Sequence, residues 1–247
     1  MGQLLEEVIN AHGGLGRWER VSQLRAEISM GGPIWTAKGW AGALDHETIT
    51  VDADRQHSVV EPFLDPDQRA VFDVADERVT IENSAGRPPV TRTHARDHFR
   101  SYVRSTPWDE YDLGYFVGYA LWTYLTTPFL LTYPGFRTWE IEPWVEAGQT
   151  WRRLQVIFPP TVTTHSTEQT FYFDHKLLQR RLDYSPSVLG SSLVGHYTSG
   201  HRTFDGIVIP TRRRAFRRNQ DASVNLNLNT ITIDIGHVSV IPKDSHE

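Results

Sequence analysis

A run of 24 residues, 113–136, contains no charged side chain. The run reads LGYFVGYALWTYLTTPFLLTYPGF, whereas the rest of the sequence is polar, strand-like and rich in charges. Its aromatic rings between 115 and 129 are Tyr115, Phe116, Tyr119, Trp122, Tyr124 and Phe129. A segment of this kind either crosses a membrane or is buried inside the fold, where its rings can line an apolar cavity.

Length alone allows this run to span a membrane, because about 20 apolar residues cross a bilayer. Threonines, tyrosines and the prolines Pro128 and Pro134 make it less apolar than a typical span. The run also lies in mid-chain, between strand-like segments that should belong to one sheet. The sequence therefore favours a buried helix that is broken near Pro128, and a membrane-spanning helix is the alternative.

The overall composition narrows the class of protein. A net charge of −5 argues against nucleic-acid binding, because phosphate backbones are bound by basic surfaces. The absence of cysteine excludes disulfides, cysteine nucleophiles and thiolate metal sites, and is compatible with a reducing cytoplasm. The first residues, MGQLLEEVIN, have neither the basic nor the long apolar region of a secretory signal. We therefore expect a cytoplasmic protein.

The periodicity of apolar residues predicts a mainly β fold. Residues 3–12 have helical spacing, and from residue 21 apolar and polar positions alternate, with turn signals about every ten residues. No linker or repeat divides the chain, so we expect a single domain over residues 1–247. Its parts are strands within 21–92, a helical insert at 94–133 and further strands within 136–241. The prediction is an antiparallel sheet of about eleven strands that curls, with helices covering its concave face.

Four segments carry a resemblance to a known family. They are LLEEVINAHGGLGRWERVSQLRAEI, HRTFDGIVIPTRRRAF, PWDEYDLGYFVGYALWTYLTTPFLL and FPPTVTTHSTEQTFYFD. The first two resemble the first helix-to-strand passage and the late basic strand of the LolA-like lipoprotein-carrier superfamily, and the others resemble a bacterial branch related to it. The resemblance implies an unclosed half-barrel that holds acyl chains under its helices. A cofactor-free cytoplasmic enzyme of the violacein pathway is also related to this fold, so the resemblance leaves an enzyme possible.

Aromatic side chains are the first candidate ligand-binding residues. Tyr115, Tyr119 and Trp122 fall on one face of the expected helix, and rings with polar tips suit a lipid, a polyketide or an aromatic metabolite. The alternative is that these rings only fill the core. The expected ligand contacts are Trp35 and Trp40 on early strands, Tyr115, Tyr119, Trp122 and Phe129 in the insert, and Gln169, Phe171 and Phe173 on a late strand.

Histidines on the late strands are the candidate catalytic residues. His165 shares the expected strand face of Gln169, and a histidine in an apolar pocket can act as a general acid or base. His196 and His201 should face opposite sides of a regular strand unless a bulge intervenes. We expect any catalysis to involve His165, His196 and Tyr197; the alternative is that these side chains are exposed or hydrogen-bonded for structural reasons.

Two histidines have the spacing of a metal-binding pair. His94 and His98 would lie one turn apart on a helix within 94–104, but Arg96 lies between them and no third ligand is evident. We therefore predict no metal site. The sequence also lacks a glycine-rich phosphate loop and a dinucleotide fingerprint, so no cofactor is predicted.

An arginine run occupies one late strand. Alternation places Arg213 and Arg217 on the opposite face from Arg212, Arg214 and Arg218. One of these arginines could hold a carboxylate or phosphate at a pocket mouth, or the run could cover the outside of a barrel.

Together these patterns predict a protein that binds a hydrophobic small molecule in an aromatic-lined half-barrel cavity. The alternative is a cofactor-independent enzyme of secondary metabolism that uses the same pocket with a histidine as acid–base. Membrane contact is compatible with either function but is required by neither. The sequence defines neither the ligand nor the oligomeric state.

Overall fold

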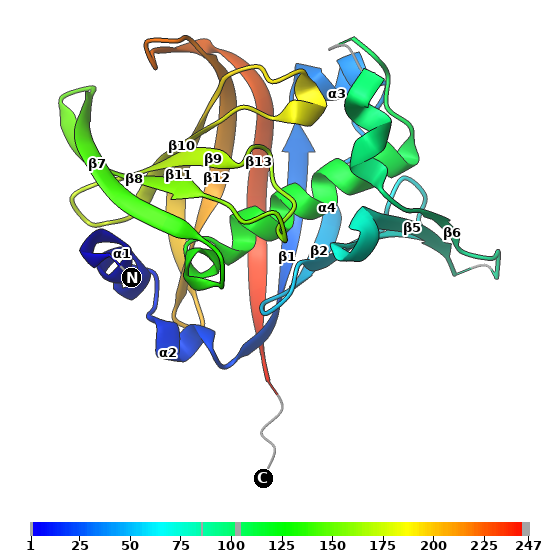
Figure 1. Cartoon of the computed structure of the whole chain (residues 1–247). Helices are drawn as coiled ribbons and strands as arrows, with labels where there is room; N and C mark the ends of the chain where they lie inside the picture. Colours follow the sequence, from blue (N-terminus) through cyan, green and yellow to red (C-terminus); the bar gives the residue numbers. More distant parts are fainter. Residues whose placement is uncertain (1, 85, 102–104, 244–247) are drawn as a thin grey trace.

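A computed structural model describes residues 2–84, 86–101 and 105–243 of the chain. Within these residues a single 13-stranded antiparallel sheet bends around one long helix (Figure 1). The elements are α1 (Gln3–Ala11), α2 (Leu15–Trp18), β1 (Val21–Gly31), α3 (Pro33–Lys38), β2 (Glu47–Asp52), β3 (His57–Glu61), β4 (Gln68–Asp73), η1 (Ala75–Glu77), β5 (Arg78–Asn83), β6 (Val90–Arg92), η2 (Ala95–Ser101), α4 (Glu110–Thr126), η3 (Phe129–Thr132), β7 (Arg137–Glu146), β8 (Gln149–Ile157), β9 (Glu168–Phe173), β10 (Gln179–Tyr184), η4 (Ser187–Leu189), β11 (Val194–Phe204), β12 (Ile207–Arg218) and β13 (Val224–Pro242).

The sheet consists of two meanders joined at their first and last strands. Its order is β6-β5-β4-β3-β2-β1-β13-β12-β11-β10-β9-β8-β7, so the N-terminal strand β1 pairs with the C-terminal strand β13 in the middle. Strands β6 and β7 lie at the two ends of this order. The sheet is therefore unclosed, which confirms the predicted antiparallel half-barrel, although it has more strands than the eleven or so expected.

Buried and exposed side chains alternate along the strands, so the sheet has a buried concave face and a more exposed convex face. On β1, Leu24, Ala26 and Ile28 are buried, whereas Arg25 and Glu27 are exposed. Residues paired across neighbouring strands share a face, so Leu24 and its partner Val51 on β2 both lie on the concave face. The concave face is thus apolar and lies against the helices.

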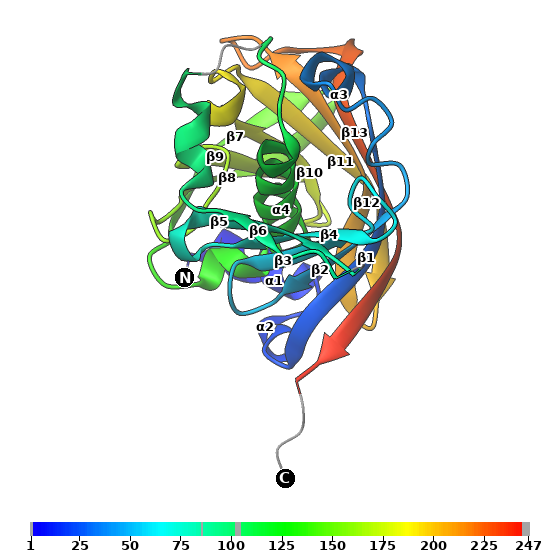
Figure 2. The same ribbon diagram turned by 90° about the vertical axis from the view of Figure 1, so that its right-hand side faces the viewer.

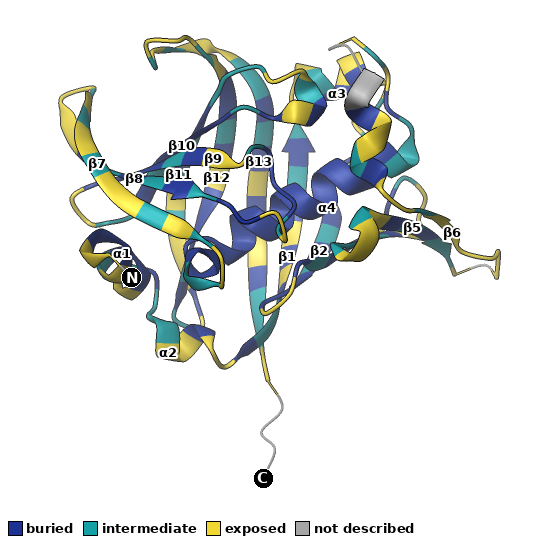
Figure 3. Cartoon of the chain, viewed as in Figure 1, coloured by how far each residue is buried: buried dark blue, intermediate teal, exposed yellow. Residues whose placement is uncertain are grey.

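Helix α4 contains most of the uncharged run and lies within the concave face (Figures 2 and 3). Asp109 caps its first turn, accepting hydrogen bonds from the backbone N–H groups of Tyr111 and Asp112. Every residue from Asp112 to Thr126 is buried, as expected for a helix that is apolar on all sides. The prediction of a buried helix is confirmed, and no helix in the described part of the chain is long and apolar enough to cross a membrane.

The end of α4 agrees with the break expected near Pro128. Thr127, which precedes the proline, is extended with ψ 136°, because the ring of a proline disfavours the helical conformation of the residue before it. The hydroxyls of Thr126 and Thr127 donate to the carbonyl oxygens of Trp122 and Thr123, four residues back. Phe129 then begins the short helix η3.

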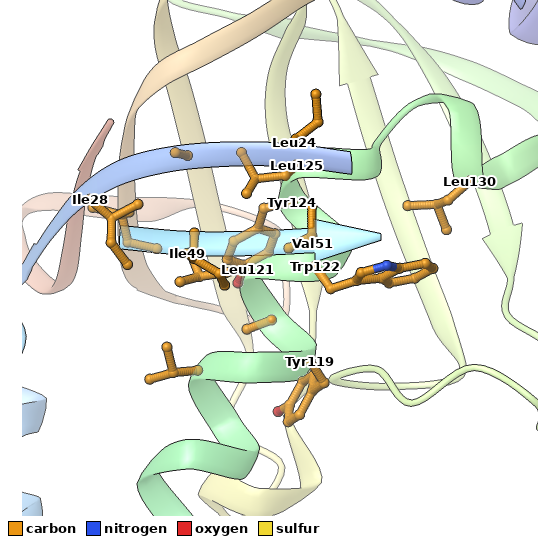
Figure 4. Close-up of a cluster of buried hydrophobic side chains, with 14 of the residues drawn as sticks. Leu24, Ile28, Ile49, Val51, Tyr119, Leu121, Trp122, Tyr124, Leu125 and Leu130 are labelled. Atoms are coloured by element: carbon orange, nitrogen blue, oxygen red, sulfur yellow. The ribbon is translucent and has the colours of Figure 1, made fainter. Parts of the chain in front are cut away.

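Small residues let α4 lie close to the N-terminal meander. A Cβ atom at Gly118 would lie 2.5 Å from Cβ of Phe72 on β4, and one at Gly114 would lie 3.1 Å from Val79 on β5. Larger side chains of the same helix, including Leu121 and Leu125, pack beneath β1 and β2 (Figure 4). The helix is therefore a fixed part of the core.

Two segments differ from the expected secondary structure. Trp35 and Trp40 were expected on a strand, but Trp35 lies in helix α3 and Trp40 follows it, after Gly39 in a left-handed conformation. The expected helix at 94–104 is instead the 3-10 helix η2 after His94, and residues 102–104 of that prediction lie outside the described residues. In both places a glycine or a positive φ angle interrupts the expected pattern.

Candidate functional site

Five buried side chains form one hydrogen-bonded group on the concave side, here called the Tyr–His network. The hydroxyl of Tyr119 lies 2.9 Å from Nδ1 of His165, and Nε2 of His165 lies 2.6 Å from the Tyr124 hydroxyl. The Tyr124 hydroxyl lies 3.1 Å from that of Tyr184, which lies 3.2 Å from Nδ1 of His196. Every ring is at most 5% exposed.

The network joins α4 to the C-terminal meander. Tyr119 and Tyr124 belong to α4, Tyr184 ends β10, and His196 lies on β11. His165 lies in the connection between β8 and β9 rather than on a strand, and its ring stacks on Tyr184 at 4.3 Å. The network therefore fixes the orientation of α4 relative to three separate parts of the sheet.

Burial keeps these groups neutral. Burial lowers the pKa of His165 to about 3, with a further contribution from the positive charge of Arg96. The pKa of His196 is held well below its usual value by burial, and Arg213 and His165 act in the same direction. Burial also raises the pKa of Tyr124 to about 12. At neutral pH the network therefore consists of neutral imidazoles and phenols.

Neutrality allows two opposite proton orders in the network, and among the described residues each leaves one proton unpaired at one end. Each phenol has one proton and each imidazole has one N–H, so the bonds run either from Tyr119 towards His196 or the reverse. The reversed order leaves the Tyr119 proton without an acceptor among the described residues. The order from Tyr119 to His196 places a proton on Nε2 of His196, which has no hydrogen-bond partner in the described part of the chain.

Arg96 lies beside the end of the network formed by Tyr119 and His165, and its hydrogen bonds hold the neighbouring residues in place. Its guanidinium donates to the Tyr115 hydroxyl (2.8 Å) and to the carbonyl oxygen of Thr164 (2.6 Å), next to His165. The Tyr115 hydroxyl in turn donates to Glu77, 2.9 Å away. Tyr115 and Tyr119 thus lie near one cation, and the loop that carries His165 is tied to α4 from outside.

A narrow, mostly apolar crevice leads from the surface to the network. Its outer part has a volume of about 40 Å³ and lies between Ile34 of α3, Leu189 of η4 and Arg217 of β12. A smaller inner part, of about 10 Å³, is bounded by Met30, Ile233 and the ring of His196. The two parts share walls formed by Phe116, Tyr184, Ala215 and Ile231.

A second, polar groove approaches the network from another side. It has a volume of about 640 Å³, and half of its lining residues are serines and threonines, among them Ser166 and Ser187. His165 lines both this groove and the outer crevice. His165 therefore separates a polar surface groove from an apolar interior space.

The structure brings together some predicted site residues. Tyr119, His165 and His196 meet in the Tyr–His network, although His165 was expected on a strand. Tyr197 does not join them, because it is the next residue of β11 and points to the convex face. There its hydroxyl donates to Glu146 at 2.6 Å. The expected catalytic group is thus divided between the two faces of the sheet.

The other predicted ligand contacts lie in the core, and none lines the crevice. Trp122 donates to the carbonyl oxygen of Asp52, and Phe129 stacks on Trp18 at 4.5 Å. Gln169 donates to Thr164 and Ser166, and so orders the loop around His165. Trp35, Trp40, Tyr115, Phe171 and Phe173 complete the packing between the helices and the sheet. Ligand contact by this whole set stays a prediction.

Sequence reasoning missed the residues that define the crevice. Phe116, Ala215 and Ile231 look like ordinary core positions, and Tyr184 was not among the predicted site residues. Arg213 was correctly placed on the face opposite Arg212, but alternation gave no sign that it would be 1% exposed. A charged residue at a core-facing strand position was the available signal.

A group of possible cation ligands lies around His98, and the absence of a metal site stays a prediction. Among the described residues, His98, Asp109 and Asp112 could hold a cation. Arg92 already lies among them, 2.7 Å from Asp109 and 3.2 Å from Asp112. These residues cap the start of α4, and the guanidinium supplies the positive charge. His94 lies before η2 and is not part of the group.

Comparison with known proteins identifies the fold. No protein-family model matches the chain, and no curated protein matches its sequence. A LolA superfamily protein from Nitrosomonas europaea aligns over 98% of this chain and 92% of its own, with a TM-score of 0.53 and 10% identity. A domain assigned to outer membrane lipoprotein sorting, from Vibrio parahaemolyticus, aligns over 99% and 93%, with a TM-score of 0.55 and 9% identity. The fold is LolA-like.

A third solved structure has a similar fold. A DUF1329 family protein from Desulfovibrio piger covers 99% of this chain and 93% of its own, with a TM-score of 0.52 and 12% identity. At such identities the likeness establishes architecture, and the site has to be argued from the residues of this chain.

Proposed function

We propose that this LolA-like protein binds a hydrophobic small molecule in the crevice between α4 and strands β10–β13. The observation that carries the proposal is the apolar path from the surface to the inner pocket beside His196. Apolar walls with a few polar groups at one end are typical of small-molecule sites. The lipoprotein-sorting description of one structural neighbour supports the same class of ligand.

The crevice is smaller than a typical ligand site. Its outer part of about 40 Å³ compares with several hundred Å³ for common binding pockets. A ligand with a hydrocarbon chain therefore has to displace side chains at the shared wall, among which Phe116 of α4 is the largest apolar one. The structure accordingly represents a closed form of the proposed site.

Native mass spectrometry of gently purified protein, followed by denaturing extraction, tests the proposal. We expect a discrete bound mass that is released as an apolar compound. Ala215→Leu adds volume at the wall shared by both parts of the crevice and should abolish the bound mass. Ala41→Leu is the control, because Ala41 is exposed and lines neither part of the crevice. Wild-type protein that neither carries nor takes up any compound from a lipid extract would refute the proposal.

A cofactor-independent enzyme is the second candidate, and Nε2 of His196 is the observation that favours it. Both nitrogens of His165 are hydrogen-bonded, so His196 offers the free nitrogen of the network for proton transfer. A binding protein should release its compound with unchanged mass after incubation. An enzyme should change that mass, and His196→Ala should then stop the change without removing the bound compound.

The cytoplasmic location stays a prediction from composition. Cell fractionation tests it, and the native spectrum also reports the oligomeric state. Co-sedimentation with liposomes tests for membrane contact, which the proposed function does not require.

A further inference from the structure

Arg213 is a buried cation without a counter-charge among the described residues. Its side chain lies beneath the last turn of α4, where Nη2 donates to the carbonyl oxygen of Tyr124 at 2.8 Å. The guanidinium also lies over the Tyr124 ring, 4.6 Å from the ring centre. Its Nε and Nη1 atoms are buried and have no hydrogen-bond partner in the described chain.

The surroundings of Arg213 contain no acidic group that could balance it. No described carboxylate lies within salt-bridge distance, and the groups that favour its charged form are the phenols of Tyr124 and Tyr184. Burial lowers the pKa of Arg213 only to about 10, so the side chain stays charged at neutral pH. A buried charge is normally paired, because removing it from water is costly.

His196 adds a further donor next to this cation. On neighbouring strands, His196 pairs with Ala215 and Thr198 pairs with Arg213, so the two side chains are diagonal neighbours on the concave face. Nε2 of His196 has no hydrogen-bond partner among the described residues, and it carries a proton when the Tyr–His network runs from Tyr119 to His196. His196 also lines the inner part of the crevice. Arg213, with its two unpartnered nitrogens, lies beside His196 on the neighbouring strand, next to this inner part.

We propose that Arg213 and His196 bind the carboxylate of an amphiphilic ligand whose hydrocarbon chain occupies the crevice. This inference rests on the proposed function and names its ligand class. A carboxylate fits better than a phosphate, because one guanidinium and one neutral imidazole match a single negative charge in a small space. The ligand then lies with its carboxylate inward and its chain towards Arg217 at the mouth.

Three amphiphiles of equal chain length test the inference on the wild-type protein. Laurate, lauryl alcohol and laurylamine differ only in the head group, and binding is measured by tryptophan fluorescence below the concentration at which each forms micelles. We expect laurate to bind about tenfold or more tightly than the alcohol, and the amine to bind most weakly. If the alcohol binds as tightly as laurate, the carboxylate anchor is wrong while the hydrophobic site stands. If none of the three binds, both proposals fail.

Variants of the wild-type protein then test which side chains bind the carboxylate. Arg213→Met keeps most of the side-chain volume and should reduce laurate binding to the level of the alcohol, while leaving the alcohol unchanged. His196→Phe, which retains Arg213, should weaken laurate several-fold and provides a second variant if the first does not fold. Arg212→Met is the control, because Arg212 is an exposed arginine on the opposite face of the same strand and lines neither part of the crevice. Undiminished laurate binding by Arg213→Met or by His196→Phe would overturn the assignment.

Discussion

Tyr124 connects the two buried histidines of the concave face. Its hydroxyl lies between Nε2 of His165 and the hydroxyl of Tyr184, and its ring lies beneath Arg213. A phenol suits this position because one hydroxyl can donate and accept at the same time. No apolar ring of the same shape can keep both neighbours hydrogen-bonded.

Replacing Tyr124 by phenylalanine should therefore cost more than one hydrogen bond. The change leaves His165 and Tyr184 without a shared partner inside the core, and we expect the free energy of unfolding to fall by about 1–3 kcal/mol. Urea unfolding measures this value. Tyr111→Phe, at the half-buried start of α4, is the control and should change stability by less than about 0.5 kcal/mol. Equal losses in the two variants would contradict a structural role for the network.

The buried histidines predict an acid-sensitive fold. Burial lowers the pKa of His165 to about 3, against an ordinary value near 6.5 in the unfolded chain, and shifts His196 in the same direction. Between these pH values the unfolded chain binds more protons than the folded protein, so stability falls as the pH falls. The loss is complete only below the folded pKa.

His165 should contribute a slope of up to about 1.4 kcal/mol per pH unit between about pH 6 and pH 3, and His196 should add to the fall in stability at acid pH. Urea unfolding at several pH values measures the total slope, to which carboxylates also contribute. His165→Phe should reduce the slope of the free energy of unfolding against pH by about the contribution of one histidine. A variant at His165 with the wild-type slope would show that its pKa is not lowered by folding.

At the scale of elements, α4 depends on the absence of side chains at two positions. A Cβ at Gly118 would lie 2.5 Å from Phe72 Cβ and 3.0 Å from the Ser58 hydroxyl. The helix lies this close to β3 and β4 only because glycine leaves room. The position of every crevice wall contributed by α4, including Phe116, follows from that approach.

Gly118→Ala should consequently destabilise the protein despite the better helix propensity of alanine. We expect a loss of about 1–3 kcal/mol from overpacking, measured by urea unfolding. Gly16→Ala on α2 is the matched control, since nothing lies within 4 Å of a Cβ there, and it should stabilise by up to about 1 kcal/mol. If both alanine variants are stabilised alike, the close contact of α4 with the sheet is not rigid.

Only some of the helices and strands could be predicted from the sequence. The uncharged run and the proline at 128 correctly predicted a buried, interrupted helix. Helix α3 was missed, although Pro33 at its start and Gly39 at its end are ordinary helix boundaries, because Ile34 and Trp35 suggested a strand. The three residues of β6 are too few to show an alternating pattern, which is one reason why the strand count fell short.

Within the candidate site, alternation predicted which face of a strand a residue occupies but not its partners. Arg213 was placed opposite Arg212, and the same rule would have separated Tyr197 from His196. The contacts between α4 and Tyr184 depend on the rotation of the helix inside the half-barrel, and no local pattern encodes that rotation. The crevice, which consists of the space left between these elements, was therefore not predictable.

At the scale of the whole molecule, a second buried arginine holds the convex face together. Arg181 on β10 is fully buried and forms ion pairs with Asp183 (2.6 Å) and with Glu146 of β7 (2.7 Å). It also donates to the carbonyl oxygen of Ala222, between β12 and β13. Unlike Arg213, this arginine has its counter-charges within the protein and links distant parts of the sheet.

Arg181→Met should lower the free energy of unfolding by up to about 3–5 kcal/mol, because among the described residues it leaves the buried Asp183 with the cation of Arg218 alone and the half-buried Glu146 without its cation. Hydrogen exchange should become faster in β7 and β8, which the arginine ties to the sheet. Arg212→Met, on the same convex face but exposed, should change stability by no more than about 0.5 kcal/mol. Unchanged exchange in β7 and β8 would show that pairing with β9 alone holds them.

The helix inside the half-barrel has a consequence for the speed of capture. Because α4 already fills the concave side, a ligand of the proposed crevice would meet a closed surface and would enter only when the wall around Phe116 moves aside. The rate of uptake would then stop rising with ligand concentration once opening becomes the slow step. The same closure would slow escape, so even a modest number of contacts could retain a captured molecule for a long time.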